Sequence, residues 1–293
     1  MLDQQANNYE VMTDGHPPAS WDEYVQIVFE EWGQMLSDPN VGEPEMHDFL
    51  EKHPCMIPGH DAFNAAGPGR TPAGPIRACL FSKPPLPGIS KRIPDFMWLP
   101  TDSQTQWVVL VEIEDPRKRW LTDKGEQCAK LTQAVNQVLS WKEHIANPTN
   151  LLQFAQMYRL SMYRPVEFIF CLVYGRRGEV QKESAARKLN ELRRQGLIWM
   201  TYDRLAPVEA TRNFLSVRVY GEEFRAVYAP ATLRINLNLI GMWENVTQKP
   251  DAVLASPHFT DERRDFLVER FRYWDAYLKN GGKLPPADWM AGE

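Results

Sequence analysis

Three acidic side chains stand out because they lie beside the most apolar part of the chain. Asp95 follows Pro94 at the start of one predicted strand, and Glu112 and Glu114 lie near the end of the next. Residues two apart in a strand point to the same side of the pleat, so Glu112 and Glu114 share one face of the predicted sheet. Carboxylates beside a buried sheet require a partner or a function, because burying an unpaired charge is costly.

A divalent metal site would explain these acids. Magnesium prefers hard oxygen ligands on rigid elements, and Asp95, Glu112 and the main-chain carbonyl of Ile113 could supply them from adjacent strands. Such an ion orients a water, lowers its pKa and stabilises charge that develops on a phosphate. We therefore expect Mg²⁺ or Mn²⁺ and phosphodiester hydrolysis. Glu45 lies on the margin of the apolar face of a short helix and is a further candidate ligand, whereas Glu51 points away from that face.

The helix predicted after the second strand carries a stripe of amides. Gln133, Gln137 and Trp141 recur at every fourth position and so lie along one side of that helix. An amide can orient a water or contact a phosphate without changing the charge. We prefer Gln137 to Gln133 as a catalytic candidate, and a plain polar helix face is the alternative.

Hydrophobic patterning predicts the elements that must position these groups. The predicted fold is mixed α/β, with a central domain, which the resemblance described below makes nuclease-like, at 41–206 between a helical N-terminal extension at 1–40 and an α+β C-terminal extension at 207–293. Residues 1–19 are expected to be loose, 58–75 to form a Gly/Pro-rich loop, and 207–243 to form a few strands before a helix capped by Thr260. A helix is predicted at 20–36 in the N-terminal extension. Within the central domain, helices are predicted at 44–53, 126–145, 149–162 and 179–195, and strands at 79–83, 93–100, 107–116, 166–175 and 197–205.

Composition narrows the class of protein. A chain of 293 residues with 43% hydrophobic content can bury a substantial core, and its net charge of -5 argues against a simple polyanion-coating protein. The four cysteines lack metal-ligand spacing, and the spacings of His47, His53 and His60 match no ligand motif, so packing or loop roles are expected for these histidines. The N-terminus lacks signal-peptide features and the apolar runs are too short to span a bilayer, so we expect a cytoplasmic protein without membrane contact.

Several basic residues follow the acids. Arg117, Lys118 and Arg119 come directly after Glu114, and Lys142 lies on the amide-bearing helix. These cations and Gln133 are candidates for contacts with the phosphates of DNA. A further basic segment spans 176–194. A solvated helix face is the alternative interpretation for such runs.

The spacing of Asp95 from Glu112-Ile113-Glu114, with 16 residues between, resembles the PD-(D/E)xK nuclease motif. A wider set of motifs in order resembles the Shedu family of bacterial anti-phage defence nucleases. This resemblance implies a restriction-endonuclease-like core, metal-dependent cleavage or nicking of phage DNA, and homo-oligomers. The motifs are FLEKHP at 49–54, IPDF at 93–96, VEIEDP at 111–116, QAVNQVLSW at 133–141 and TYDRL at 201–205.

Carried over to this chain, Asp95 and Glu112 match the two metal-binding acids, while Glu114 stands where the motif has a lysine. Glu114 cannot supply that positive charge, but it could hold a second metal or act as a base, with Lys118 or Lys142 as the substitute ammonium. One alternative to a nuclease is a catalytically weak or inactive fold that binds nucleic acid or regulates as an oligomer. Another is an interaction protein that assembles through its C-terminal region.

Overall fold

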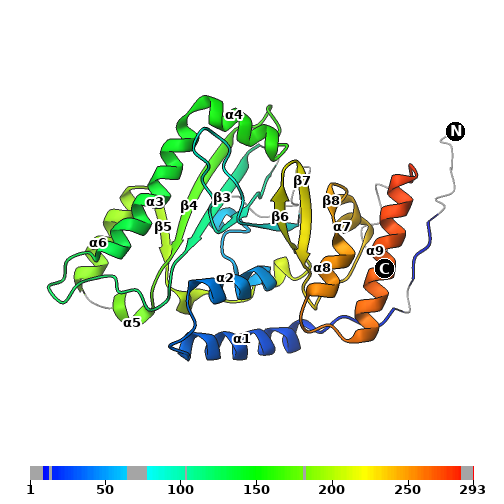
Figure 1. Ribbon diagram of the computed structural model, residues 1–293, viewed down its shortest axis with the longest axis horizontal. Helices are drawn as coiled ribbons and strands as arrows, with labels where there is room; N and C mark the ends of the chain where they lie inside the picture. The colour runs from blue at the N-terminus through cyan, green and yellow to red at the C-terminus, as the bar shows by residue number, and fades with distance from the viewer. Residues whose placement is uncertain (1–8, 13–14, 65–77, 103, 181–182, 285–292) are drawn as a thin grey trace.

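The computed structural model of the chain describes residues 9–12, 15–64, 78–102, 104–180, 183–284 and 293. Its strands form one mixed sheet in the order β5-β4-β3-β2-β1-β6-β7-β8 (Figure 1). The predicted mixed α/β architecture is confirmed. The strands are β1 Cys79–Ser82, β2 Phe96–Trp98, β3 Gln106–Ile113, β4 Val166–Val173, β5 Leu197–Met200, β6 Leu215–Tyr220, β7 Glu223–Tyr228 and β8 Val246–Thr247.

Helices surround this sheet. Figure 1 shows α3, α4 and α6 at the end of the sheet that holds β3 to β5, and α7 to α9 at the end that holds β6 to β8, with α1 and α2 along the lower side of the view. The helices are α1 Trp21–Ser37, α2 Glu43–Lys52, α3 Ala129–Ala146, α4 Pro148–Met157, α5 Arg177–Val180, α6 Glu183–Arg194, α7 Leu237–Met242, α8 Lys249–Ala255 and α9 Asp261–Lys279.

Strand β3 is the centre of the fold. All eight of its residues are buried, and it pairs in parallel with β4 along its whole length and antiparallel with β2. Its run of Val and Leu residues suits a strand covered on both faces. The two glutamates at its end are therefore attached to the most rigid part of the molecule.

Helix α1 begins as the sequence predicts. The Ser20 hydroxyl accepts a hydrogen bond from Glu23 N–H at 3.3 Å, and the Glu23 carboxylate accepts from Ser20 N–H at 3.2 Å. This reciprocal pair satisfies main-chain donors that the first helical turn leaves free. Thr260 caps α9 in the same way, accepting from Arg263 N–H at 3.2 Å.

Part of the C-terminal prediction is wrong. The expected strands around 215–228 are β6 and β7, but residues 237–242, expected as a strand, form α7. The Asn236 side chain accepts from Leu239 N–H at 2.8 Å and so caps this helix. A short apolar run does not distinguish a buried helix from a strand, and here the cap decides. Strand β6 pairs in parallel with β1, so the region after residue 206 completes the same sheet.

The expectation that residues 1–19 are loose is wrong for the described residues 9–12 and 15–19. Met12 N–H donates to the Glu293 carbonyl at 3.1 Å, and Ala19 N–H donates to the Ala231 carbonyl at 3.1 Å. Buried Arg270 of α9 donates to the Glu10 carbonyl at 2.6 Å. The N-terminal segment is thus fastened to the C-terminal region. Of the predicted Gly/Pro-rich loop, residues 65–75 lie outside the described residues.

Candidate functional site

Lys83, Asp95 and Glu112 form a row across β1, β2 and β3. Phe96 pairs with Val111 across β2 and β3, so one further step in this antiparallel register brings Asp95 opposite Glu112. On the other side of β2, Lys83 N–H donates to the Asp95 carbonyl at 2.7 Å. Side chains that lie opposite each other in a sheet share a face at short distance. The predicted juxtaposition of the two acids is therefore present.

Asp95 is held from two sides. One carboxylate oxygen contacts the Lys83 ammonium, and the other accepts a hydrogen bond from Ile113 N–H at 2.9 Å. This second bond stands in place of a main-chain ladder bond at the end of β2. Asp95 is only 4% exposed, whereas the Lys83 side chain is 47% exposed. The ammonium group thus reaches from the buried acid toward the surface.

Glu112 is the most constrained acid of the site. The Gln137 amide, from the exposed side of α3, donates to its Oε1. Its Oε2 is buried and has no hydrogen-bond donor among the described residues. Burial and the adjacent Asp95 carboxyl raise the pKa of Glu112 well above its usual range, because the charged form is poorly solvated and faces a like charge. An unpartnered buried carboxylate oxygen of this kind is suited to a cation.

Glu114 lies two residues further along and has its own partner. Its carboxylate contacts the Lys118 ammonium, which also lies 3.5 Å from the Glu43 carboxylate at the start of α2. Burial and the Glu114 carboxyl raise the pKa of Glu43. The acid of α2 that adjoins the site is therefore Glu43. The candidate ligand Glu45 instead accepts from Gly42 N–H at 2.9 Å and closes the N-terminus of its own helix.

Tyr202, in the TYDRL motif, packs on Trp32 of α1, with ring centroids 5.8 Å apart, and lies within range of the charge of the same acids. The residue is fully buried, and its hydroxyl has no hydrogen-bond partner in the part of the chain that the structure describes. Burial, with the nearby carboxyls of Asp95 and Glu43, raises its pKa well above 10.0. The phenol is thus neutral and available to donate a hydrogen bond.

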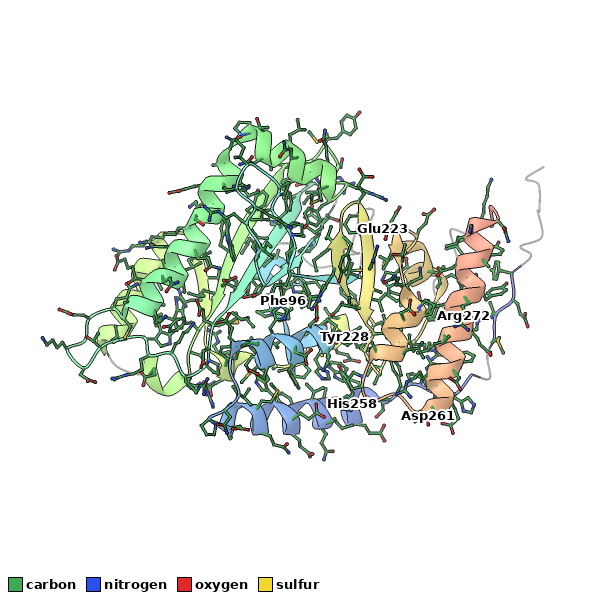
Figure 2. The ribbon with its side chains drawn as sticks, in the orientation of Figure 1. Phe96, Glu223, Tyr228, His258, Asp261 and Arg272 are labelled. Atoms are coloured by element: carbon green, nitrogen blue, oxygen red, sulfur yellow. The ribbon has the colours of Figure 1, made fainter. Side chains whose placement is uncertain are left out.

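His47 supports the strand that carries Asp95. Its ring stacks on Phe96 with centroids 4.6 Å apart, and its Nε2 lies 3.5 Å from the Ser82 hydroxyl. Figure 2 labels Phe96 near the centre of the molecule. Burial and the Lys83 ammonium lower the pKa of His47, so the ring is neutral. This histidine has the packing role that its sequence context suggests.

The orientation predicted for Glu51 is wrong. It is buried, and Arg218 of β6 donates to both of its carboxylate oxygens, at 2.5 and 2.7 Å. The sequence gave no sign of this pair, because the two residues come from distant parts of the chain. Burial of a helical acid is possible here because the guanidinium fork matches a carboxylate.

The cations predicted to contact DNA are engaged within the protein. Arg117 pairs with Asp115 at 2.6 Å, Arg119 pairs with Asp123 at 2.6 Å, and Lys142 donates to a main-chain carbonyl after α6 at 3.3 Å. Arg117 also donates to a main-chain carbonyl before α2. A phosphate would have to compete with these partners.

The structure describes Gln133 of the amide stripe and part of the basic segment 176–194. Gln133 lies exposed one turn before Gln137 on α3. In the basic segment, Arg176 donates to the Asp203 carboxylate at 2.9 Å, and the Arg193 guanidinium lies over the Trp199 ring, 5.7 Å from its centroid. Outside the described side chains lie Lys182, Arg187 and Lys188.

The sequence interpretation missed Lys83, Glu43 and Tyr202. A signal existed for Tyr202, which lies inside a motif already singled out. Lys83 is the last residue of a predicted strand, but its proximity to Asp95 depends on strand order, which local pattern does not reveal. Among the helices that the structure describes, none is long and apolar enough to cross a membrane.

Four carboxyls and two ammonium groups therefore meet beside the central strands of the mixed sheet of an α/β protein. A family model described as Shedu protein SduA, C-terminal, matches residues 40–206, more than half of the chain. The chain belongs to the Shedu family, and this membership suggests a role in defence. A comparison of the chain with curated proteins found no match. All of the site residues described above lie within the matched region.

Proposed function

We propose that this chain is a metal-dependent DNA endonuclease or nickase of the PD-(D/E)xK type, acting on phage DNA in the cytoplasm as a homo-oligomer. The observation that carries the proposal is Glu112, whose buried Oε2 has no donor within the described structure and whose neighbour is a second carboxyl, Asp95. Two adjacent buried acids are unfavourable unless a proton or a cation lies between them. Family membership supports the same activity.

The residues present fit a Mg²⁺ or Mn²⁺ ion. Asp95 and Glu112 supply hard oxygen ligands from neighbouring strands, and the Ile113 carbonyl is the expected third ligand. When bound, the ion lowers the pKa of a water and stabilises charge on the phosphate. The protein fixes the ligands: Gln137 orients one oxygen of Glu112, and the Ile113 N–H orients Asp95.

Lys83 replaces the lysine that the motif lacks at Glu114. Its ammonium already lies at Asp95, and its half-exposed side chain can also meet a phosphate that approaches the acids. Lys118 is less available, because the carboxylates of Glu114 and Glu43 both adjoin its ammonium. An ammonium beside a developing phosphate charge stabilises the transition state.

A supercoiled plasmid tests this proposal. Purified chain with Mg²⁺ or Mn²⁺ should convert supercoiled plasmid to nicked or linear DNA, and chelator should stop the reaction. Asp95→Asn and Glu112→Gln should abolish cleavage. Glu45→Gln is a matched control on a nearby helix, because the amide retains the oxygen that accepts from Gly42, and it should cleave normally. Cleavage that survives Asp95→Asn, or that needs no metal, would refute the assignment.

The second candidate is a nuclease fold that binds DNA without cutting it. Glu114 favours this candidate, since it stands in the lysine position and neutralises Lys118. Gel-shift binding by clean protein with no nicking over long incubation with Mg²⁺ and Mn²⁺ would support it. Nicking that is lost in Asp95→Asn, with binding retained, would exclude it.

A further inference from the structure

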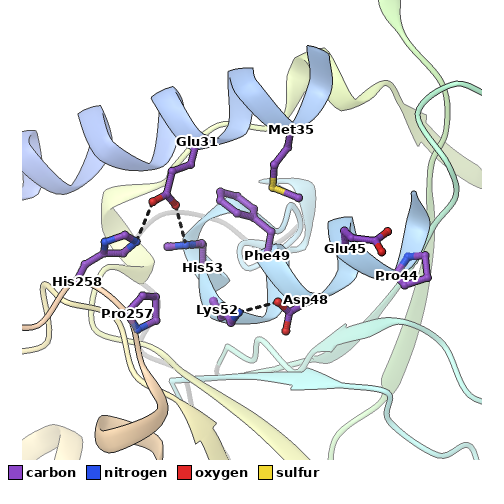
Figure 3. Close-up of a pocket in the computed structure, with 10 residues that line it drawn as sticks. All are labelled: Glu31, Met35, Pro44, Glu45, Asp48, Phe49, Lys52, His53, Pro257 and His258. Carbon is purple, nitrogen blue, oxygen red and sulfur yellow. Dashed lines mark hydrogen bonds and ion pairs between the residues drawn. The ribbon is translucent and has the colours of Figure 1, made fainter. Parts of the chain in front are cut away.

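Glu31, His53 and His258 come together from three separate segments (Figure 3). Glu31 lies on α1, His53 follows the last residue of α2, and His258 lies in the turn before α9; Figure 2 labels it beside α1. The His258 Nε2 is 3.4 Å from one Glu31 oxygen, and the His53 Nε2 is 3.9 Å from the other. Ligand atoms from the three side chains all lie within 4.8 Å of one another. None of these three side chains belongs to the candidate site formed by the acids around Glu112 and by Lys83 and Lys118.

We propose that these three side chains bind one zinc ion. Four ligands at about 2.0–2.2 Å in a tetrahedron lie roughly 3.4 Å apart, so the observed separations need only a small adjustment. The cluster lines a cavity of about 520 Å³ between α1, α2 and the turn at Pro257. Three protein ligands leave a fourth position, which this cavity makes accessible to water.

The His53 ring is oriented as a ligand. It is 2% exposed, and its Nδ1 lies 2.8 Å from the buried Tyr24 hydroxyl. A ring that donates its Nδ1 proton to the Tyr24 oxygen presents the lone pair of Nε2 toward Glu31. Metal-bound histidines commonly use the second ring nitrogen in this way, which fixes both tautomer and orientation.

Hydrogen bonding within the cluster does not account for the contact between His53 and Glu31. Their 3.9 Å separation is longer than a hydrogen bond. When the Nδ1 proton is donated to Tyr24, the ring turns an unprotonated Nε2 toward the Glu31 carboxylate. Two acceptors then face each other, and a cation between them would satisfy both.

The donor set selects the metal. Two imidazole nitrogens and one carboxylate suit zinc, whereas magnesium prefers oxygen ligands, so the two proposed sites differ in chemistry. Glu31 and His258 lie outside the segment that matches the Shedu family model, and His53 lies inside it. One zinc ion would therefore fasten both terminal regions to the domain that matches the family model.

Zinc binding to the full-length, chelator-treated chain tests the proposal. Titration against a chromophoric competitor should give one zinc per chain at this site. His258→Asn should weaken zinc binding at least about tenfold, since loss of even an outer-shell partner costs about 10–100-fold. Asn is suitable because residue 258 has a φ of 66°, a left-handed conformation that Asn tolerates. The matched control is His16→Asn, the same change at an exposed histidine, which should bind as the wild type does.

Three further measurements separate the outcomes. Glu31→Gln changes a residue with a 40% exposed side chain on α1, so it serves if His258→Asn fails to fold, and it should also weaken zinc binding. Asp95→Asn should retain the zinc while losing cleavage, which keeps this test independent of the nuclease assignment. Added zinc should raise the Tm of wild type and of His16→Asn but not of His258→Asn. Absence of tight zinc binding to the wild type, or equal affinity in the wild type, Glu31→Gln and His258→Asn, would overturn the proposal.

Discussion

Replacing Glu112 with glutamine should stabilise the metal-free protein while abolishing its activity. In the wild type, Glu112 Oε2 is buried without a donor in the described structure, and the neighbouring Asp95 carboxyl adds a like charge. Glutamine keeps an oxygen for the Gln137 amide and replaces the other oxygen with an NH₂ group. That group can donate a hydrogen bond toward Asp95. The substitution therefore removes an electrostatic conflict from the folded state.

The expected gain in stability follows from the buried Oε2 of Glu112, which has no hydrogen-bond donor among the described residues. A buried polar atom without its partner costs about 1–3 kcal/mol, so Glu112→Gln should raise the free energy of unfolding by about this amount near pH 7 in the presence of chelator. The raised pKa fixes the pH dependence. The folded state holds the Glu112 proton more tightly than the unfolded chain, so wild-type stability falls as pH rises from about 4.3 through the folded pKa. The difference in free energy of unfolding between Glu112→Gln and the wild type should therefore shrink toward pH 4 and grow toward pH 7.

Urea denaturation, followed by tryptophan fluorescence, measures this difference. Glu114→Gln is the contrasting variant, because Glu114 has an ion-pair partner in Lys118 and its loss should destabilise the chain by about 1.5 kcal/mol. Mg²⁺ at about 100 times its Kd should stabilise the wild type by about 2.7 kcal/mol and Glu112→Gln far less. If Glu112→Gln destabilises the metal-free protein as Glu114→Gln does, the interpretation of Glu112 as a strained metal ligand is incorrect.

Three further changes probe other parts of the fold. Lys83→Met should lower single-turnover plasmid nicking by about 10²–10³-fold with the fold intact by circular dichroism, and unchanged nicking would remove Lys83 from the site. Arg218→Met should lower the free energy of unfolding by about 3–5 kcal/mol, because it leaves Glu51 charged and buried, and adding Glu51→Gln should recover part of this loss. Asp203→Asn should cost about 1 kcal/mol at pH 7, and this cost should disappear once the pH has fallen through the folded pKa of Asp203. Burial raises the pKa of Asp203, but hydrogen bonds including those from Arg176 outweigh it and leave the pKa lowered, so this stability is present above about pH 3.9 and is lost as pH falls through the folded pKa.

Local patterns predicted most of the elements, because each is bounded by residues that stop it. The run that forms β4 lies between Pro165 and Gly175, and Ser20 and Thr260 cap their helices as predicted. The order of the strands in the sheet could not be predicted from such local patterns. The parallel pairing of β1 with β6 joins segments more than 130 residues apart, and no local periodicity encodes it.

The site was predictable where one motif specified two neighbours. Asp95 and Glu112 share a face because they lie opposite each other on antiparallel strands that are consecutive in the chain. The preference for Glu45 over Glu51 left Glu43 out of consideration, and Glu45 is the third residue of α2 and caps its N-terminus. A glutamate at the third position of a helix is a capping signal, because its carboxylate can accept a hydrogen bond from the residue before the helix. This signal assigns Glu45 to the cap and leaves Glu43 as the acid of the first turn to consider for the site.

Helix α2 lies between the proposed zinc site and the proposed nuclease site and contacts both. With 10 residues it is about 15 Å long, and it bears contacts at both ends. Glu43 in its first turn shares Lys118 with Glu114, Glu51 in its last turn pairs with β6, and His53 follows its end. A helix this short moves as a rigid unit, so a tilt imposed at His53 also displaces Glu43. The ammonium of Lys118 would then shift toward Glu114 or away from it, beside the acids proposed as metal ligands. We therefore expect zinc bound at His53 to alter the charge around Glu114 through the packing of α2.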